Sequence, residues 1–139
     1  MLLLDNSAWA RIVGGSLDDE RAATVAAWTD RRELTICLPF LLEAGYSARS
    51  ADHHRAMMSD FALLPHIAIT PDVEESARRA QRELAAIGHH RLAPLDVMIA
   101  ACAHEAGAGV LHYDRDYEVL ANRTTLEFAS VWVSPPGSL

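Results

Sequence analysis

The sequence contains no lysine, and all 12 of its basic residues are arginines. A phosphate-binding site that depends on a lysine ammonium is therefore excluded. The 19 acidic residues outnumber the arginines, and the formal net charge is −7. This balance argues against a protein that binds nucleic acid through a broad basic face, although bound cations would neutralise part of the negative charge.

Cysteines and long apolar runs are also scarce. The two cysteines, Cys37 and Cys102, lie inside apolar stretches rather than at a paired spacing, so we interpret both as small buried side chains. The longest apolar run, 97–103, is far shorter than the roughly 20 residues that a membrane span needs. Residues 1–4 are too few for the core of a signal peptide. We therefore expect a cytoplasmic protein with no membrane segment.

Apolar runs typical of buried strands alternate along the chain with segments of helical periodicity. With 139 residues, of which 50% are hydrophobic and 22% charged, the composition predicts one globular domain. We expect an α/β fold with a mostly parallel central sheet of four to five strands and helices on both faces. The predicted strands are 2–5, 34–38, 66–69, 110–113 and, at one edge, 129–133. The predicted helices include a first one capped by Asn6 or Ser7, then 18–29, one that begins at Pro39, one that ends before Pro65, 70–87 and 94–106.

Four acidic residues stand at informative places in this pattern. Asp5 ends the first apolar run, and Asp114 follows the run at 110–113. Acids at the carboxyl ends of parallel strands point into the crevice where open α/β sheets bind ligands. Glu43 and Asp96 lie on predicted helices that could pack beside those strands. Taken singly, each has a simpler explanation: a helix cap, a solvated helix face, a favourable charge near a helix N-terminus or a solvated turn.

Together, four segments carry a resemblance to a known family. They are Leu-Leu-Asp-Asn-Ser at 3–7, Leu-Leu-Glu-Ala-Gly at 41–45, Pro-Leu-Asp-Val-Met-Ile-Ala-Ala at 94–101 and Asp-Arg-Asp-Tyr at 114–117. In order and spacing this pattern resembles PIN-domain proteins, and the chain length is similar to that of the VapC toxins of bacterial toxin–antitoxin pairs. Three positions depart from the family pattern. Asn6 replaces a common threonine, His112 a usual hydroxyl residue and Tyr117 a usual phenylalanine.

The resemblance implies a single PIN-like domain over 1–139 with the activity of a metal-dependent endoribonuclease. The products would carry a 5′-phosphate and a 3′-hydroxyl. The implied catalytic acids are Asp5, Glu43, Asp96 and Asp114, with Glu43 orienting water or binding a second metal. The implied metal ligands are Asp5, Asp96, Asp114 and the additional acid Asp116, with Asn6 and Ser7 as hydrogen-bonding support.

Elementary electrostatics agrees with a metal at such a site. Carboxylates brought close together repel one another and raise one another's pKa unless a cation lies between them. Mg²⁺ prefers oxygen ligands, and Mn²⁺ suits the same ligands, whereas zinc favours histidine or cysteine. Arginine forms the best bidentate contacts with phosphate. The candidates for contacting RNA are the arginines nearest the acids in sequence, Arg11, Arg49, Arg91 and Arg115.

The resemblance also implies partners. A cognate VapB-like antitoxin would place its C-terminal segment in a groove near the acids, and the protein would form a homodimer. Trp9, Ile12, Phe40 and Met57 are candidates for that groove or the dimer face, with ordinary core packing as the simpler interpretation.

Two other functions are alternatives to the nuclease. Aspartyl-phosphate chemistry needs a lysine and, in its phosphatase form, a second acid two residues after Asp5, and both are missing. A non-catalytic metal-bound module that binds RNA or protein remains an alternative.

Overall fold

The computed structural model describes residues 1–89 and 91–139, and this part of the chain contains five strands. The strands form one sheet in the order β3-β2-β1-β4-β5, and every neighbouring pair is parallel. The predicted α/β class is confirmed, with a sheet that is parallel throughout rather than mostly. The strands are β1 (Leu2–Leu4), β2 (Leu34–Cys37), β3 (His66–Ile67), β4 (Gly109–His112) and β5 (Ser130–Trp132).

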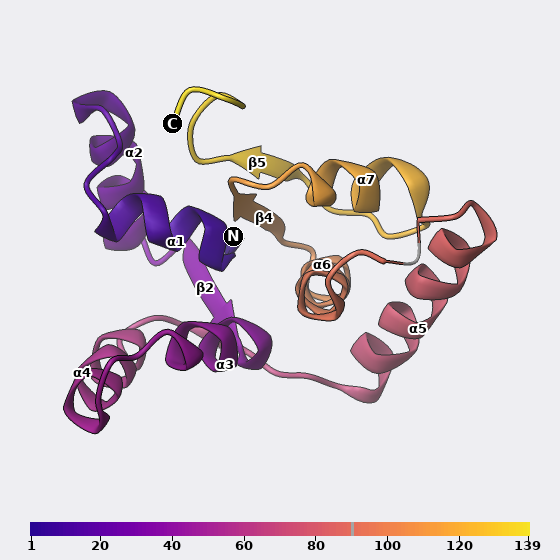
Figure 1. Ribbon diagram of the computed structural model, residues 1–139, viewed down its shortest axis with the longest axis horizontal. Coiled ribbons are helices and arrows are strands. Elements are labelled where there is room, and N and C mark those ends of the chain that lie inside the picture. Colours follow the sequence, from indigo (N-terminus) through magenta and orange to yellow (C-terminus); the bar gives the residue numbers. More distant parts are fainter. Residues whose placement is uncertain (90) are drawn as a thin grey trace.

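Helices cover both faces of the sheet, as the sequence predicted. Figure 1 shows α1, α2 and α4 on one side of the strands and α5, α6 and α7 on the other. Among the described residues, none of the helices has the length and apolar character that crossing a membrane demands. The helices are α1 (Asn6–Val13), α2 (Asp19–Asp30), α3 (Leu38–Tyr46), α4 (Ala51–Phe61), α5 (Pro71–Ala86), α6 (Pro94–Ala106) and α7 (Asp116–Arg123).

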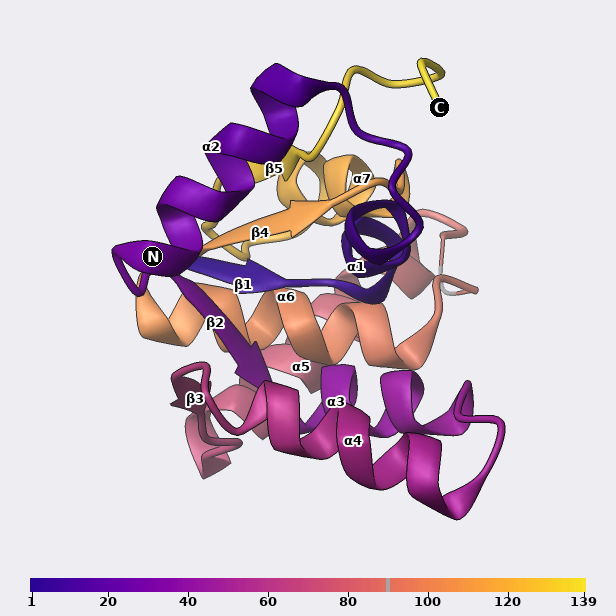
Figure 2. The ribbon, with the colours of Figure 1, turned by 90° about the vertical axis from the view of Figure 1, so that its left-hand side faces the viewer.

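The strand order creates a crevice at the carboxyl ends of β1 and β4. From β1 the chain moves to β2 and then β3 on one side, whereas β4 and β5 lie on the other side of β1. Figure 2 shows β1 and β4 side by side with α1 beginning where β1 ends. Such a reversal of strand order is where open parallel sheets bind ligands. The fold therefore predicts a site at this edge.

Aromatic packing joins three of the helices that surround this crevice. The ring of Phe61 on α4 makes edge contacts with Trp9 on α1 and Phe40 on α3, with centroid separations of 5.1 and 5.0 Å. Phe40 and Phe61 are almost completely buried. Edge-to-face pairs of this kind stabilise a packing geometry beyond the area that they bury. The cluster therefore holds α1 and α3 in a defined relation.

Two local predictions needed correction. The cap of α1 is Asp5, not Asn6 or Ser7, because Asp5 has an extended backbone and its carboxylate accepts a hydrogen bond from the Ser7 amide. Helix α7 was not predicted, since its short segment has the sequence pattern of a polar turn. It forms because Tyr117 and Leu120, on one face of the helix, are fully buried.

Candidate metal centre

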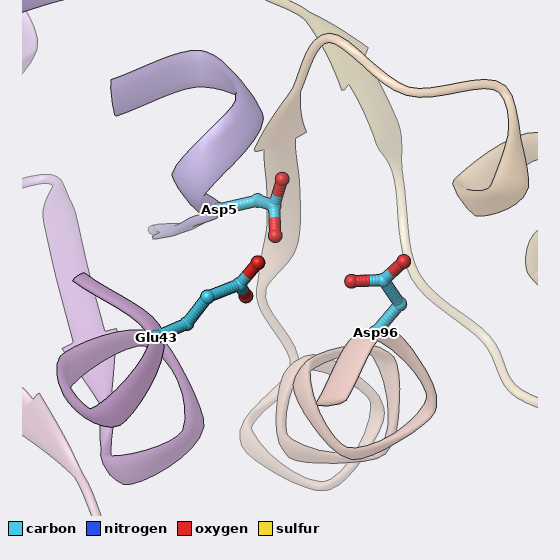
Figure 3. Close-up of side chains that lie close together, drawn as sticks. All are labelled: Asp5, Glu43 and Asp96. Atoms are coloured by element: carbon cyan, nitrogen blue, oxygen red, sulfur yellow. The ribbon is translucent and has the colours of Figure 1, made fainter. Parts of the chain in front are cut away.

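Asp5, Glu43 and Asp96 come together at the crevice from three separate parts of the fold. Each residue offers a carboxylate oxygen, and these oxygens all lie within 4.8 Å of one another. Asp5 follows β1, Glu43 lies on α3, and Asp96 lies in the first turn of α6. Figure 3 shows the three carboxylates pointing toward a common space. The strand order and the helix packing have thus brought together residues that are up to 91 positions apart along the sequence.

Both carboxylate oxygens of Asp5 are hydrogen-bonded. Oδ1 accepts from the Tyr117 hydroxyl at 2.7 Å, and Oδ2 accepts from the Ser7 amide at 2.8 Å and from the Ser7 hydroxyl. Ser7 Oγ in turn accepts from the Tyr113 amide at 2.8 Å, which ties α1 to the end of β4. Asp5 is only 3% exposed, so these bonds offset its desolvation and hold its orientation.

Asn6 supports Glu43. Its side-chain amide donates to the Phe40 carbonyl at 3.0 Å and to Glu43 Oε2 at 3.4 Å. Burial and the nearby charge of Asp5 raise the pKa of Glu43, and the Asn6 hydrogen bond partly opposes that rise. Asn6 and Ser7, expected to give hydrogen-bonding support, thus contact Glu43 and Asp5 respectively.

Asp96 is the most perturbed acid of the group. Desolvation, followed by the charges of Asp5, Asp114 and the other acids, raises the pKa of Asp96 from 3.8 to about 7. None of the ion pairs found among residues 1–89 and 91–139 includes Asp5, Glu43 or Asp96. A carboxylate in this position therefore lacks a compensating side-chain cation, and a bound metal ion would supply that charge.

Asp114 and Asp116 extend the site beyond Asp96. Ligand oxygens of Asp96, Asp114 and Asp116 also lie within 4.8 Å of one another. The Asp114 carboxylate accepts a hydrogen bond from the Asp116 amide at 3.0 Å, which orders the turn into α7. Burial and the charge of Asp114 raise the pKa of Asp116. Asp96 belongs to both groups, so the five predicted acids form one continuous acidic site.

The chemistry of these donors fits a hard divalent cation. The groups consist of carboxylate oxygens, the ligands that Mg²⁺ and Mn²⁺ prefer. His112, the nearest imidazole in sequence, uses both ring nitrogens in protein hydrogen bonds, with Ser130 and with the Asp114 amide. The donor set therefore suits magnesium or manganese better than zinc.

The four arginines proposed for RNA contact differ in their surroundings. Arg11 donates to the Ser7 carbonyl at 3.2 Å, and its guanidinium lies 4.5 Å from the centre of the Tyr113 ring. These contacts join Arg11 to the α1–β4 packing. Arg49, Arg91 and Arg115 are exposed. Their contact with RNA stays a prediction.

A groove of about 720 Å³ runs from Glu43 across the surface of α1, α3 and α4. Two of the candidates for a groove or dimer face, Trp9 and Met57, form part of its lining, whereas Phe40 is fully buried in the core. Asn6, Glu43 and Arg49 lie in the same lining. The groove therefore joins an apolar surface directly to the acidic site.

Tyr117 is the site residue that sequence reasoning left without a role. Its departure from the usual phenylalanine was visible, but the position alone does not show where a hydroxyl points. In the fold the hydroxyl lies 2.7 Å from Asp5 Oδ1 and 3.4 Å from Asp96 Oδ1. The one local sequence signal for a role of Tyr117 in the site was its position directly after the acidic pair Asp114 and Asp116.

The sequence profile of the PIN domain matches residues 2–123, so the chain belongs to the PIN-domain family. Its relatives within that family are VapC ribonucleases. The protein named Ribonuclease VapC17 of Mycobacterium tuberculosis is 38% identical over 124 residues, which cover 86% of each chain. Ribonuclease VapC18 of the same species is 32% identical over 139 residues, which cover 98% of this chain and 97% of the relative.

Solved structures show the same fold. The DNA-bound VapBC of Salmonella typhimurium superposes with a TM-score of 0.75 at 19% identity, over 96% of this chain and 100% of that chain. The VapBC2 of Rickettsia felis, bound to a DNA fragment from its promoter, superposes with a TM-score of 0.72 at 15% identity. The match covers 94% of this chain and 98% of that chain.

Proposed function

We propose that this protein is a metal-dependent endoribonuclease that acts as the toxin of a toxin–antitoxin pair. The observation that carries the proposal is the convergence of Asp5, Glu43 and Asp96, continued by Asp114 and Asp116, at the crevice of a PIN-domain fold. The curated relatives named as VapC ribonucleases support RNA as the substrate.

Asp5, Asp96 and Asp114 would hold Mg²⁺, or Mn²⁺ in its place, with Asp116 as a further acid. When bound, the ion supplies an activated water, a contact to the scissile phosphate and stabilisation of the leaving oxygen. Glu43 orients the attacking water and accepts its proton, a role that suits a carboxylate whose pKa is raised. The Asn6 amide keeps that carboxylate turned toward the site. The cut leaves a 5′-phosphate and a 3′-hydroxyl.

Cleavage of total RNA by the purified protein tests this function. We expect cuts with Mg²⁺ or Mn²⁺ that disappear with EDTA and fall by at least about 100-fold in Asp5→Asn, since loss of outer metal partners alone costs 10–100-fold. Asp18→Asn is the matched control, because Asp18 also caps a helix with its carboxylate, at the start of α2, but is exposed. Intact RNA from folded, metal-binding protein would instead support the non-catalytic binding module. Mapping the ends of the products identifies the cut phosphate and its RNA.

Arg49 is the arginine placed best for RNA, because it lines the groove together with Glu43. We expect Arg49→Ala to lower kcat/KM by about 10-fold, the effect of one charge-assisted hydrogen bond, and to weaken the dependence of binding on salt. Arg55→Ala is the control, because Arg55 is exposed and pairs with Asp52 on α4. Equal kcat/KM values for the two variants would exclude Arg49 from substrate binding.

A VapB-like antitoxin is the proposed inhibitor. Its segment would occupy the groove, where the apolar surfaces of Trp9 and Met57 adjoin the acidic side chains of Glu43 and Asp60. A segment that combines apolar side chains with an arginine complements this surface and the net charge of −7. A solved structure that shares the fold, with a TM-score of 0.61 at 17% identity, is a toxin–antitoxin complex from Klebsiella pneumoniae, and this supports such a partner.

A homodimer is the proposed assembly, with α3 at its interface. Leu38, Leu42 and Tyr46 recur every four residues on α3 and are 52%, 60% and 92% exposed. Such a stripe on one helix face marks an interaction surface. We expect Leu42→Arg to weaken dimerisation at least about 30-fold in light scattering, the effect of losing a hot spot. Ile87→Arg is the control, because Ile87 is an exposed residue that follows α5 as its C-cap, and the variant should dimerise as the unmodified protein does.

A further inference from the structure

Tyr117 and His112 pack against each other directly behind the acidic site. Their ring centroids are 4.9 Å apart, and both side chains are fully buried. The Tyr117 hydroxyl donates a hydrogen bond to Asp5 Oδ1 at 2.7 Å, and the Tyr117 hydroxyl oxygen also lies 3.4 Å from Asp96 Oδ1. A phenylalanine would fill almost the same volume without that donor. The hydroxyl therefore adds an orienting contact to one of the acids and not only packing.

His112 makes the corresponding contact to the other side of the site. The Asp114 amide donates to His112 Nδ1 at 3.1 Å, so this nitrogen carries no proton. The ring proton is thus assigned to Nε2, which donates to Ser130 Oγ on β5 at 2.7 Å. The imidazole in this form links the turn that carries Asp114 to the neighbouring strand.

From these contacts we infer that Tyr117 and His112 form a positioning pair, which orients Asp5 and Asp114 for a divalent cation. Tyr117 acts through the Asp5 carboxylate, and His112 acts through the backbone of Asp114. Hydrogen bonds of this kind keep metal-binding carboxylates in one orientation before the ion arrives and so strengthen binding. The inference rests on the metal dependence in the proposed function, but it concerns metal affinity and needs no RNA.

Mn²⁺ binding to the purified protein, measured by electron paramagnetic resonance, is the test. We expect Tyr117→Phe to weaken Mn²⁺ binding by about 10-fold, as the loss of an outer partner does, while urea unfolding shows an intact fold. His112→Asn and His112→Gln form a matched pair. The asparagine oxygen can take the place of Nδ1 and accept from the Asp114 amide, whereas the glutamine amide reaches the place of Nε2. We expect His112→Asn to retain most of the Mn²⁺ affinity and His112→Gln to lose about 10-fold.

Nitrogen NMR of the unmodified protein adds a measurement that does not depend on any variant. The chemical shifts should show a neutral His112 ring with its proton on Nε2, and a proton on Nδ1 would overturn the assignment for His112. Unchanged Mn²⁺ affinity in Tyr117→Phe, or equal affinities in the two His112 variants, would overturn the positioning pair even if the protein cleaves RNA. If the Mn²⁺ affinities of the variants follow the expected order but the protein leaves RNA intact, the positioning pair would be upheld and the nuclease activity refuted.

Discussion

Asp96→Asn should nearly abolish RNA cleavage and at the same time stabilise the metal-free fold. The substitution removes a metal ligand, so we expect cleavage to fall by at least about 100-fold. It also removes a buried charge that the neighbouring acids repel. The rise in the Asp96 pKa from 3.8 to about 7 corresponds to about 4 kcal/mol against the ionised form. Relaxation and water entry at the open site reduce this, so we expect a gain of roughly 2 kcal/mol in the free energy of unfolding at pH 8.

Asp72→Asn is the matched control for this experiment. Asp72 also lies in the first turn of a helix that begins with proline, but it is exposed at the start of α5. There the charge interacts favourably with the helix dipole, so its removal should cost about 0.5 kcal/mol and leave cleavage intact. Urea unfolding in EDTA measures both changes. A loss of stability in Asp96→Asn would show that the Asp96 carboxylate is not destabilising in the folded protein.

The second large effect that we expect is that bound metal reverses the way in which the stability of the fold depends on pH. The folded-state pKa of Asp96 is raised, so between about pH 4 and about pH 7 the folded protein binds a proton that the unfolded chain has released. Without metal, Asp96 therefore makes the fold less stable as the pH rises through this window. Mg²⁺ binds the ionised form, and an ion at 100 times its Kd would add about 2.7 kcal/mol. We expect this stabilisation to grow from pH 5 to pH 8, with release of about one proton per ion near pH 6.

The contribution of His112 to the pH dependence of stability has to be distinguished from that of Asp96. Because its folded-state pKa is lowered, His112 contributes a stability that is lost as the pH falls below its ordinary value of 6.5. That slope is opposite to the slope from Asp96. The raised pKa values of Glu43 and Asp116 act in the same direction as Asp96. Urea unfolding of the unmodified protein and of Asp96→Asn is measured at each pH. The difference between their free energies of unfolding isolates the contribution of Asp96, because most of the other contributions cancel. Parallel curves for the two proteins would contradict the assignment.

These two experiments address one property of the site, a surplus of negative charge that the protein leaves uncompensated. The chain has no lysine, and the nearby Arg11 is directed to a backbone carbonyl and the face of Tyr113. Neutral donors hold Asp5 instead, through Ser7 and Tyr117. Hydrogen bonds of this kind orient a carboxylate without cancelling its charge. The site is therefore organised and still attracts a cation.

Local patterns were sufficient to predict most of the fold. The extended apolar runs at Leu2–Leu4 and Gly109–His112 form strands, and Thr70 caps α5 as expected from its position before Pro71. Helix α7 was missed because eight residues carry little periodic signal, and its formation depends on burying Tyr117 and Leu120. Prediction failed where tertiary packing, rather than local sequence, stabilises the element.

By itself, the sequence determined the alternation of strands and helices, the absence of lysine and the chemical identity of the five acids. These follow from composition and from short spacings that repeat along one strand or helix. Family resemblance had implied that Asp5 and Asp96 share a site. Only the tertiary structure decided how close their carboxylates lie, that Asp96 has a raised pKa, and that Tyr117 donates to Asp5 across 112 positions. The physical reason is that distance and desolvation between such residues depend on strand order and on the packing of helices over both faces, which no local spacing encodes.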